Sequence, residues 1–345
     1  MDLSVKADLL ADDSVQQHAL KRAHHIIEGL DAAAAHEFAR VTDVVLGDER
    51  APAAWTGGLL NQTGAPLEFS FSTASDDLRY TMEVGGSDTP PACRLGRVEG
   101  LLATLGVDSG WDGVAREFPS LQHGHSLAWG AWLGARQTLW NAHAATSRYK
   151  IYAEIPFDSN AEASSLLRRY LGAQPLPAGP CAQLVVAGAA PGSQRCEFYF
   201  EIHGRTFTRS YLSALLDRVG LARRLDDLVA LVGSFEFRHG RVPDALPNAQ
   251  YGFSYSVLPG GGEPVFSVFI FAADLAGGDA WVRQQILAAR HRESELRGYA
   301  AMTESLTERH ARASSHNMVT FSVDETGRAG LQVSLSPPPS SIDSN

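Results

Sequence analysis

The segment RYKIYAEIP at residues 148–156 carries a lysine, a tyrosine and a glutamate at every second position. Its β-branched and aromatic residues predict a β-strand, in which successive side chains point to opposite faces. Lys150, Tyr152 and Glu154 would therefore share one face, with apolar side chains on the other. A lysine beside a phenol and a carboxylate could bind an anionic group and could take part in proton transfer.

Three further predicted strands carry polar side chains along one face in the same way. These polar positions are Glu68, Arg79, Glu83, Arg195, Glu197, Tyr199 and Glu201. If the faces converge, three cations from different strands (Arg79, Lys150 and Arg195) could hold a phosphate or a carboxylate. Alternatively, Glu83, Glu154 and Glu201 pair with these cations as structural ion pairs, or the polar faces lie on the wet side of an open sheet. Alternation alone leaves these interpretations open.

The elements that must position these residues alternate helices with strand pairs about five times. Helical periodicity is expected at residues 14–47, 101–147 (mostly), 161–171, 209–233 and 279–313. Hairpins are expected at 66–86, 181–204, 251–271 and 317–337, and single strands at 149–156 and 235–240. Because the strand pairs are hairpins, a doubly wound parallel sheet is disfavoured. The pattern fits either two α+β domains or one closed antiparallel barrel, whose polar faces line an interior lumen.

Composition limits the function classes. The chain has 345 residues and a net charge of −10, so it lacks the basic field of a nucleic-acid-binding protein. No apolar run approaches the roughly 20 residues that span a bilayer, and the N-terminus lacks the layout of a signal peptide. Three widely spaced cysteines indicate reduced thiols, so we expect a cytoplasmic protein without membrane partners. The histidine pairs lack a matched ligand spacing, so no metal site is predicted.

Several of these strand segments together resemble those of a known enzyme family. TGAPLEFSF, LRYTMEVG, YKIYAEIP, PGSQRCEFYFEI, GGEPVFSVFIFAADLAGGD and LQVSLSP fall in the order and at about the spacing of the strand motifs of dimethylallyltryptophan-synthase-type aromatic prenyltransferases. The similarity covers roughly residues 55–338. It implies an α+β fold, the ABBA fold: a closed barrel of ten antiparallel strands, built from five ααββ units and surrounded by helices. Residues 1–338 would form this single domain, and residues 339–345 a disordered tail.

The resemblance also implies roles for individual residues. Glu68 matches the glutamate that accepts the indole N–H of the acceptor. The positions that match diphosphate-binding residues are Arg79, Lys150, Tyr152, Arg195 and Tyr199. Tyr152, Tyr199 and Phe269 would shield the allylic cation, and Lys150, with a lowered pKa, would take the final ring proton.

The sequence departs from the family pattern at four positions in the same pocket. Glu197 stands where the family has a lysine. Ser267 and Phe269 stand where a lysine or glutamine and a tyrosine are usual, and Ser334 replaces another tyrosine. A cation is thus exchanged for an anion, and two phenol groups that could bind diphosphate oxygens are missing.

The resemblance implies a metal-independent transferase of secondary metabolism that needs no cofactor. Its partners would be a prenyl diphosphate and an indole-type or related aromatic acceptor, and the protein would be a monomer or a homodimer. The four departures support a first alternative, a non-prenylating enzyme on the same barrel that uses Glu68 and Glu197 as acid–base groups. The second alternative is a barrel that binds an aromatic small molecule without catalysis.

Overall fold

The computed structural model describes residues 13–47, 58–86, 88–107, 112–140, 148–157, 160–240, 243–289, 295–306 and 315–337. Its strands are β1 (Leu67–Ser72), β2 (Ser75–Glu83), β3 (Ala131–Thr138), β4 (Arg148–Glu154), β5 (Ala182–Ala189), β6 (Cys196–Ile202), β7 (Tyr251–Val257), β8 (Val265–Phe271), β9 (His316–Asp324) and β10 (Ala329–Leu335). Its helices are α2 (Asp13–Leu30), α3 (Ala32–Leu46), α4 (Pro91–Thr104), α5 (Phe118–Gln122), α6 (Asn160–Leu171), α7 (Arg209–Asp217), α8 (Leu225–Gly233), α9 (Gly278–Ala288) and α10 (Arg297–Met302).

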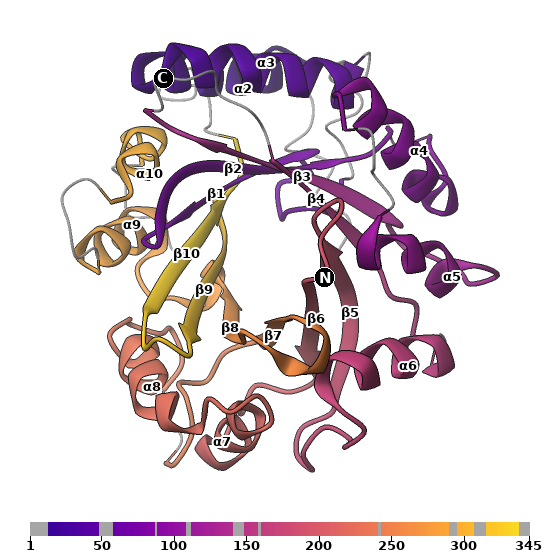
Figure 1. Cartoon of the computed structure of the whole chain (residues 1–345). Helices are drawn as coiled ribbons and strands as arrows, with labels where there is room; N and C mark the ends of the chain where they lie inside the picture. The colour runs from indigo at the N-terminus through magenta and orange to yellow at the C-terminus, as the bar shows by residue number, and fades with distance from the viewer. Residues whose placement is uncertain are drawn as a thin grey trace.

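The ten strands form one closed antiparallel barrel. Each strand pairs with its neighbours in the chain, and β10 pairs with β1 to close the ring. Figure 1 looks into this ring, with the helices arranged around its outside. The predicted fold class is confirmed, and the alternative of two separate α+β domains is wrong for these strands because all of them belong to a single sheet.

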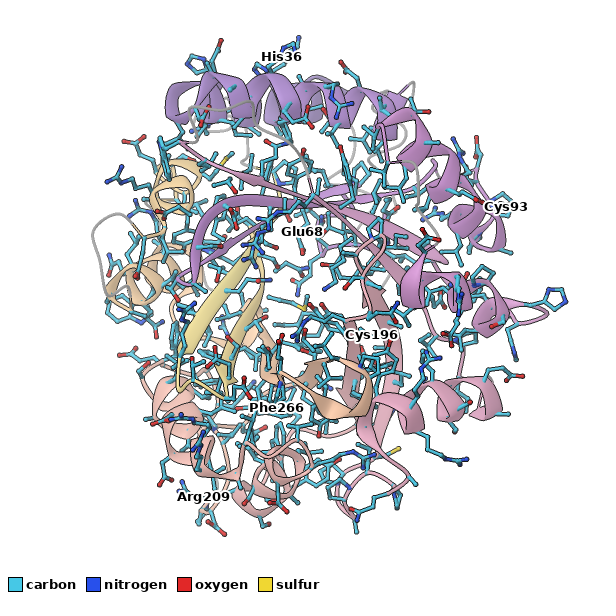
Figure 2. All side chains as sticks on the ribbon, in the orientation of Figure 1. His36, Glu68, Cys93, Cys196, Arg209 and Phe266 are labelled. Carbon is cyan, nitrogen blue, oxygen red and sulfur yellow. The ribbon has the colours of Figure 1, made fainter. Side chains whose placement is uncertain are left out.

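The outward faces of the strands form the apolar core with the helices. In β1 and β2, the side chains of Leu67, Phe69, Tyr80 and Met82 are at most 1 % exposed. Phe266 of β8 lies in the same layer, between the barrel and the helices (Figure 2). Burying one such side chain stabilises the fold by about 1.5–3 kcal/mol, so alternation forces the polar positions into the lumen.

Aromatic contacts fix the helices against the barrel wall. Phe38 of α3 packs against Phe69 and Tyr80, with ring centroids 5.6 and 5.0 Å away. On the other side of the barrel, Tyr170 of α6 meets Phe198 of β6 edge to face at 5.5 Å. These contacts hold β1, β2 and β6, three of the strands that carry predicted site residues.

The structure corrects the sequence interpretation in two places. Residues 131–138, expected within a mostly helical segment, form strand β3, which pairs with β2 and β4. Residues 235–240, expected as a strand, contribute only an isolated bridge between Phe237 and Leu275. The sequence of β3, AWLGARQT, is rich in residues with weak β preference, and tertiary pairing overrides that preference. The predicted disordered tail at 339–345 lies outside the described residues.

None of the helices in the described part of the chain is both long and apolar enough to cross a membrane.

Candidate active site in the barrel lumen

The barrel encloses a cavity of about 590 Å³, large enough for a small-molecule ligand. Of the predicted site residues, those that line it are Glu68, Tyr152, Glu197, Tyr199, Ser267, Phe269 and Ser334. Arg79 and Lys150 contact this lining through hydrogen bonds to Gln332 and Tyr199, respectively. Arg195 is not brought into the cavity wall.

Strand polarity divides the lumen into two ends. Odd-numbered strands begin where even-numbered strands end, so the inward glutamates Glu68, Glu83, Glu154 and Glu201 all lie at one end, here called the carboxylate end. The side chains that lie toward the other end, here called the cationic end, are Arg79, Arg136, Arg148, Lys150 and Arg195. Strand direction therefore gathers four glutamates at one end of the barrel axis and the cations toward the other, where Asp77 and Glu197 pair with two of them.

Glu68 is buried at the carboxylate end and is 5 % exposed. Its carboxylate accepts a hydrogen bond from the amide of Asn317 and another from Ser334. Burial raises the pKa of Glu68 from an ordinary 4.5 to about 8, although these two hydrogen bonds act in the opposite direction. Glu68 is thus a carboxyl group poised to change its charge near neutral pH.

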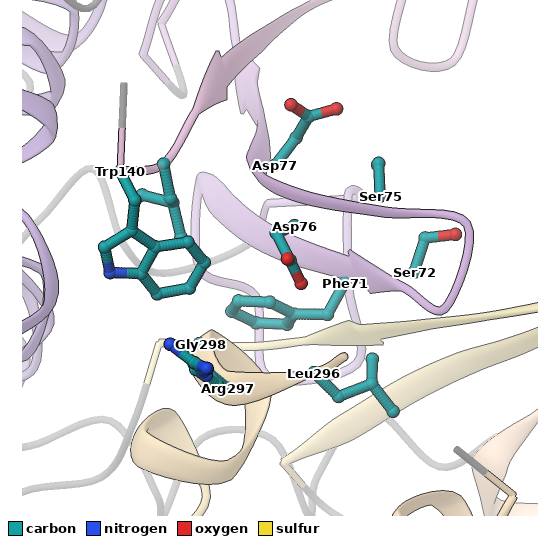
Figure 3. A pocket seen from close by; sticks show the side chains of 10 residues that line it. Phe71, Ser72, Ser75, Asp76, Asp77, Trp140, Leu296, Arg297 and Gly298 are labelled. Carbon is teal, nitrogen blue, oxygen red and sulfur yellow. The ribbon is translucent and has the colours of Figure 1, made fainter. Parts of the chain in front are cut away.

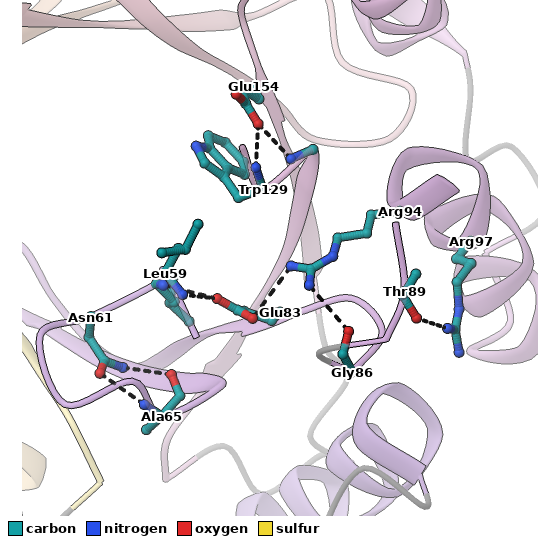
Figure 4. Close-up of polar contacts among 12 residues, drawn as sticks. Leu59, Asn61, Ala65, Glu83, Gly86, Thr89, Arg94, Arg97, Trp129 and Glu154 are labelled. Carbon is teal, nitrogen blue, oxygen red and sulfur yellow. Dashed lines mark hydrogen bonds and ion pairs between the residues drawn. The ribbon is translucent and has the colours of Figure 1, made fainter. Parts of the chain in front are cut away.

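Two other glutamates at this end hold loops at the barrel mouth (Figure 4). Glu83 accepts the backbone N–H of Leu59 at 2.5 Å and pairs with Arg94 at 3.4 Å. Glu154 accepts three backbone N–H groups of residues 128–130 at 2.6–2.8 Å. The expectation that Glu83 and Glu154 pair with lumen cations is wrong. Their carboxylates bind loop N–H groups, and Glu83 also pairs with Arg94 of α4.

Lys150, Glu197 and Tyr199 form one hydrogen-bonded triangle between β4 and β6. Lys150 Nζ forms an ion pair with Glu197 and donates to Tyr199 Oη at 3.1 Å, while Tyr199 Oη donates to Glu197. The Lys150 and Glu197 side chains are 22 % and 29 % exposed. The anion that replaces the family's lysine is therefore the counterion of the lysine that remains.

The charges in this triangle shift each other's protonation equilibria. Burial lowers the pKa of Lys150, but the adjacent Glu197 carboxylate outweighs it, and the net pKa lies above the ordinary value. Burial raises the pKa of Glu197, but the Lys150 charge and its hydrogen bond bring the net pKa below the ordinary value. The lowered pKa expected for a Lys150 base is not found.

The remaining predicted cations have partners of their own. Arg79 donates to Gln332 at 3.0 Å and to Ser75 at 2.9 Å, while its buried Nε has no hydrogen-bond partner within the described residues. Arg195 binds Glu263 at 2.6 Å on the β7–β8 turn and also donates to backbone carbonyls there. Arg195 thus stabilises the β7–β8 turn at the cationic end.

Arg136 is a candidate site residue that the sequence analysis missed, because β3 was not recognised. It is the cross-strand partner of both Arg79 and Arg148, so three arginines stand in a row on β2, β3 and β4. Like charges opposite each other repel, and Asp77, which pairs with Arg136, offsets part of this repulsion. Burial raises the pKa of Asp77, but the Arg136 charge and neighbouring hydrogen bonds bring the net pKa below the ordinary value.

Aromatic rings cover the wall between the two ends. Tyr199 lies 6.1 Å from Tyr152 and 6.3 Å from Phe269, centroid to centroid. Glycines permit this arrangement: a Cβ at Gly134 would lie 2.9 Å from the Tyr152 ring, and one at Gly252 would lie 2.1 Å from the Phe269 ring. The rings therefore lie flat against the wall and leave the lumen open for a ligand.

Trp129 and Trp132 line the cavity at its carboxylate end. Their rings stack at 3.8 Å with an interplanar angle of 14°, and Glu154 holds the backbone of Trp129 in place. The sequence does contain a signal for strand β3. Trp132, Gly134 and Arg136 stand at every second position, as the lumen-facing residues of the strand 148–154 do.

A second pocket lies near Trp140 and Arg297, outside the lumen (Figure 3). Its volume is about 10 Å³, which is room for about one water molecule. It is too small for a substrate. Within the described part of the chain, no group of three or more His, Cys, Asp or Glu side chains could hold a metal ion.

This architecture, an antiparallel ten-stranded barrel inside a ring of helices, is the prenyltransferase barrel fold. Among solved structures, the chain is similar to 5-dimethylallyltryptophan synthase from Streptomyces coelicolor in complex with DMASPP and Trp. That likeness has a TM-score of 0.71 and 17 % sequence identity, and covers 93 % of each chain. The resemblance to dimethylallyltryptophan synthases expected from the sequence is confirmed at the level of the fold.

Two further structures extend the comparison. The 6-dimethylallyltryptophan synthase from Micromonospora olivasterospora, also in complex with DMASPP and Trp, has a TM-score of 0.68 and 20 % identity over 93 % of this chain and 96 % of that chain. AnaPT from Neosartorya fischeri has a TM-score of 0.60 and 12 % identity over 92 % of this chain and 91 % of that chain. No family model matches the sequence, and no curated protein matches it at a significant level.

Proposed function

We propose that this protein is a metal-independent aromatic prenyltransferase that transfers an allylic group from a prenyl diphosphate to an indole-type acceptor. The observation that carries the proposal is the polarity of the barrel lumen. A raised-pKa glutamate lies at one end, cations lie toward the other, and aromatic rings lie between them. The similarity to barrels solved with DMASPP and Trp supports a prenyl donor and an indole acceptor as the ligands of this lumen.

The donor binds toward the cationic end in this proposal. Arg79, Arg136 and Lys150 meet the diphosphate oxygens and stabilise the charge that develops when the allylic C–O bond breaks. Arg79 has a buried Nε available for such an oxygen. Because the pKa of Lys150 is raised, its side chain stays protonated and stabilises the diphosphate through its positive charge. Arg195, which binds Glu263, supports the site from the turn.

The allylic cation lies against the faces of Tyr152, Tyr199 and Phe269, where phenylalanine serves as well as tyrosine for cation–π contact. Glu68 accepts the acceptor's ring N–H, which makes the ring more nucleophilic. A new C–C bond forms, and the resulting arenium ion loses its ring proton. Because an arenium ion is a strong acid, the weakly basic Glu197 carboxylate suffices as the base.

The test of the reaction uses the purified protein with EDTA, dimethylallyl or geranyl diphosphate, and a panel of indoles, tyrosine and hydroxynaphthalenes. Mass spectrometry should detect a prenylated aromatic product in the presence of EDTA. If no product forms and calorimetry detects no binding of either diphosphate, a non-prenylating enzyme that uses Glu68 and Glu197 as acid–base groups becomes the better proposal. That alternative is favoured by the Lys150–Glu197 pair, which removes a net charge from the donor site. The cytoplasmic location and a monomeric or dimeric state stay predictions.

Arg136→Gln is expected to raise the Kd of dimethylallyl diphosphate about tenfold, because a charge-assisted hydrogen bond to a phosphate oxygen is lost. The Kd of the acceptor should change less than about twofold, since Arg136 lies toward the opposite end of the lumen. Titration calorimetry with each ligand measures both constants. Arg168→Gln, on the exposed face of α6, removes the same charge outside the barrel and is the matched control. Equal diphosphate affinity in the two variants would exclude Arg136 from the donor site.

A further inference from the structure

Glu201 lies opposite Glu68 across the carboxylate end of the lumen. Glu68 is on β1 and Glu201 on β6, which are five strands apart in both directions around the ten-stranded ring. Both side chains line the same cavity. A ligand that binds Glu68 and spans the lumen would therefore meet Glu201.

Glu201 differs from the other glutamates at this end in having an uncommitted carboxylate. Glu83 and Glu154 bind loop N–H groups, and Glu68 binds Asn317. Within the described part of the chain, the Glu201 side chain is exposed and forms no hydrogen bond or ion pair. Its carboxylate is free to bind a ligand.

The surroundings of Glu201 favour a cation. Apart from tyrosines, the ionisable side chains among the described residues that line the cavity are Glu68, Glu197 and Glu201. The stacked indoles of Trp129 and Trp132 line the same end, and indole faces attract cations more strongly than other aromatic rings do. A carboxylate and aromatic faces together are the usual recognition surface for an ammonium group.

We infer that the acceptor is an aromatic amine whose ammonium group binds Glu201 while its ring N–H binds Glu68. This inference rests on the proposed function and narrows its acceptor class. An acceptor that carries a carboxylate on the same substituent is disfavoured, because that group meets Glu201 with like charge. The solved neighbours that contain Trp hold an amino acid with both groups, so the inference separates this chain from them.

Titration calorimetry at low salt, without any prenyl diphosphate, tests the inference with two probes that share the indole ring. Tryptamine carries an ammonium group and indole-3-propionate carries a carboxylate. We expect the Kd of tryptamine to be at least about tenfold lower than that of indole-3-propionate. Glu201→Gln should reduce this ratio at least about threefold, and Glu201→Asp should keep part of it.

Glu162→Gln, at an exposed position in the first turn of α6, removes the same charge outside the lumen and should leave the ratio unchanged. Equal affinity for both probes in the natural chain, or a ratio in Glu201→Gln within threefold of that chain's, would overturn the inference. Because these assays contain no diphosphate, their failure is distinguishable from that of the proposed function. An enzyme that prenylates tryptophan but binds both probes equally refutes the amine preference alone, and an amine preference without any prenylated product refutes the transferase alone.

Discussion

Replacement of Glu68 by glutamine is expected to lower kcat about 10²–10⁴-fold, the range typical for loss of a positioned acid–base group. The carboxylate accepts the ring N–H and strengthens that hydrogen bond as positive charge develops on the ring. An amide oxygen in the same place accepts the N–H but carries no charge. The Kd of the diphosphate should stay within about twofold, because Glu68 lies at the far end of the lumen from the cations.

The same substitution is expected to stabilise the fold. The pKa of Glu68 is about 8 in the folded chain against an ordinary 4.5, so between these pH values unfolding releases a proton. Stability of the natural chain therefore falls as pH rises from about 4.5 to 8, and glutamine abolishes this loss. Above pH 8 the variant should be more stable by about 3–5 kcal/mol, and below pH 4.5 the two proteins should be alike. Urea unfolding at several pH values measures the difference.

The pH dependence of kcat/KM gives an independent check. Activity should rise as Glu68 ionises, with an inflection near pH 8 in the free enzyme. A donated ring N–H stabilises the carboxylate, so the inflection in kcat should lie at a lower pH. If the glutamine variant kept more than a tenth of the activity, Glu68 would not be the acceptor-binding group. If it showed the same stability at pH 8.5 as the natural chain, Glu68 would not be a carboxyl of raised pKa.

Much of the barrel could be predicted because its strands alternate cleanly. In β1 and β2, large apolar side chains at every second position faced the helices as expected, and Glu68 and Arg79 faced the lumen. The ten strands were expected from the family resemblance, whereas the strand segments read from the residues included 235–240 and lacked β3. Strand β3 has Gly134 and Ala135 at its centre, where neither strong apolar alternation nor β-branched side chains mark a strand.

The polar contacts within the site could not be predicted, because they depend on register and closure. The sequence shows that Glu197 replaces a lysine, but only the pairing of β4, β5 and β6 brings it against Lys150. Likewise, Glu154 binds a loop 24–26 residues away in the chain. A glutamate that binds loop N–H groups and one with a free carboxylate look the same in a sequence. The structure distinguishes them, because Glu154 accepts three backbone N–H groups and Glu201 has no hydrogen-bond partner within the described residues.

Lys150→Met should raise the Kd of dimethylallyl diphosphate about 10–100-fold, because it removes a charged donor from the diphosphate site. It also leaves Glu197 without its counterion. Loss of one partner of a buried ion pair costs about 3–5 kcal/mol, and solvent screening lowers this here to about 1–3 kcal/mol, since both side chains are more than a fifth exposed. Lys150→Met/Glu197→Gln should recover most of the lost stability, which denaturant titration of the four proteins of the cycle measures.

Glu197→Gln separates the two roles proposed for this glutamate. Without the counterion, the full charge of Lys150 faces the diphosphate, so the Kd of the diphosphate should fall about fivefold. The ring proton then lacks its carboxylate base, so kcat should fall at least about tenfold. Affinity and turnover thus move in opposite directions, which loss of structure alone would not produce. Weaker diphosphate binding in Glu197→Gln would contradict the counterion role, and unchanged kcat would assign the ring proton to another acceptor such as the departing diphosphate.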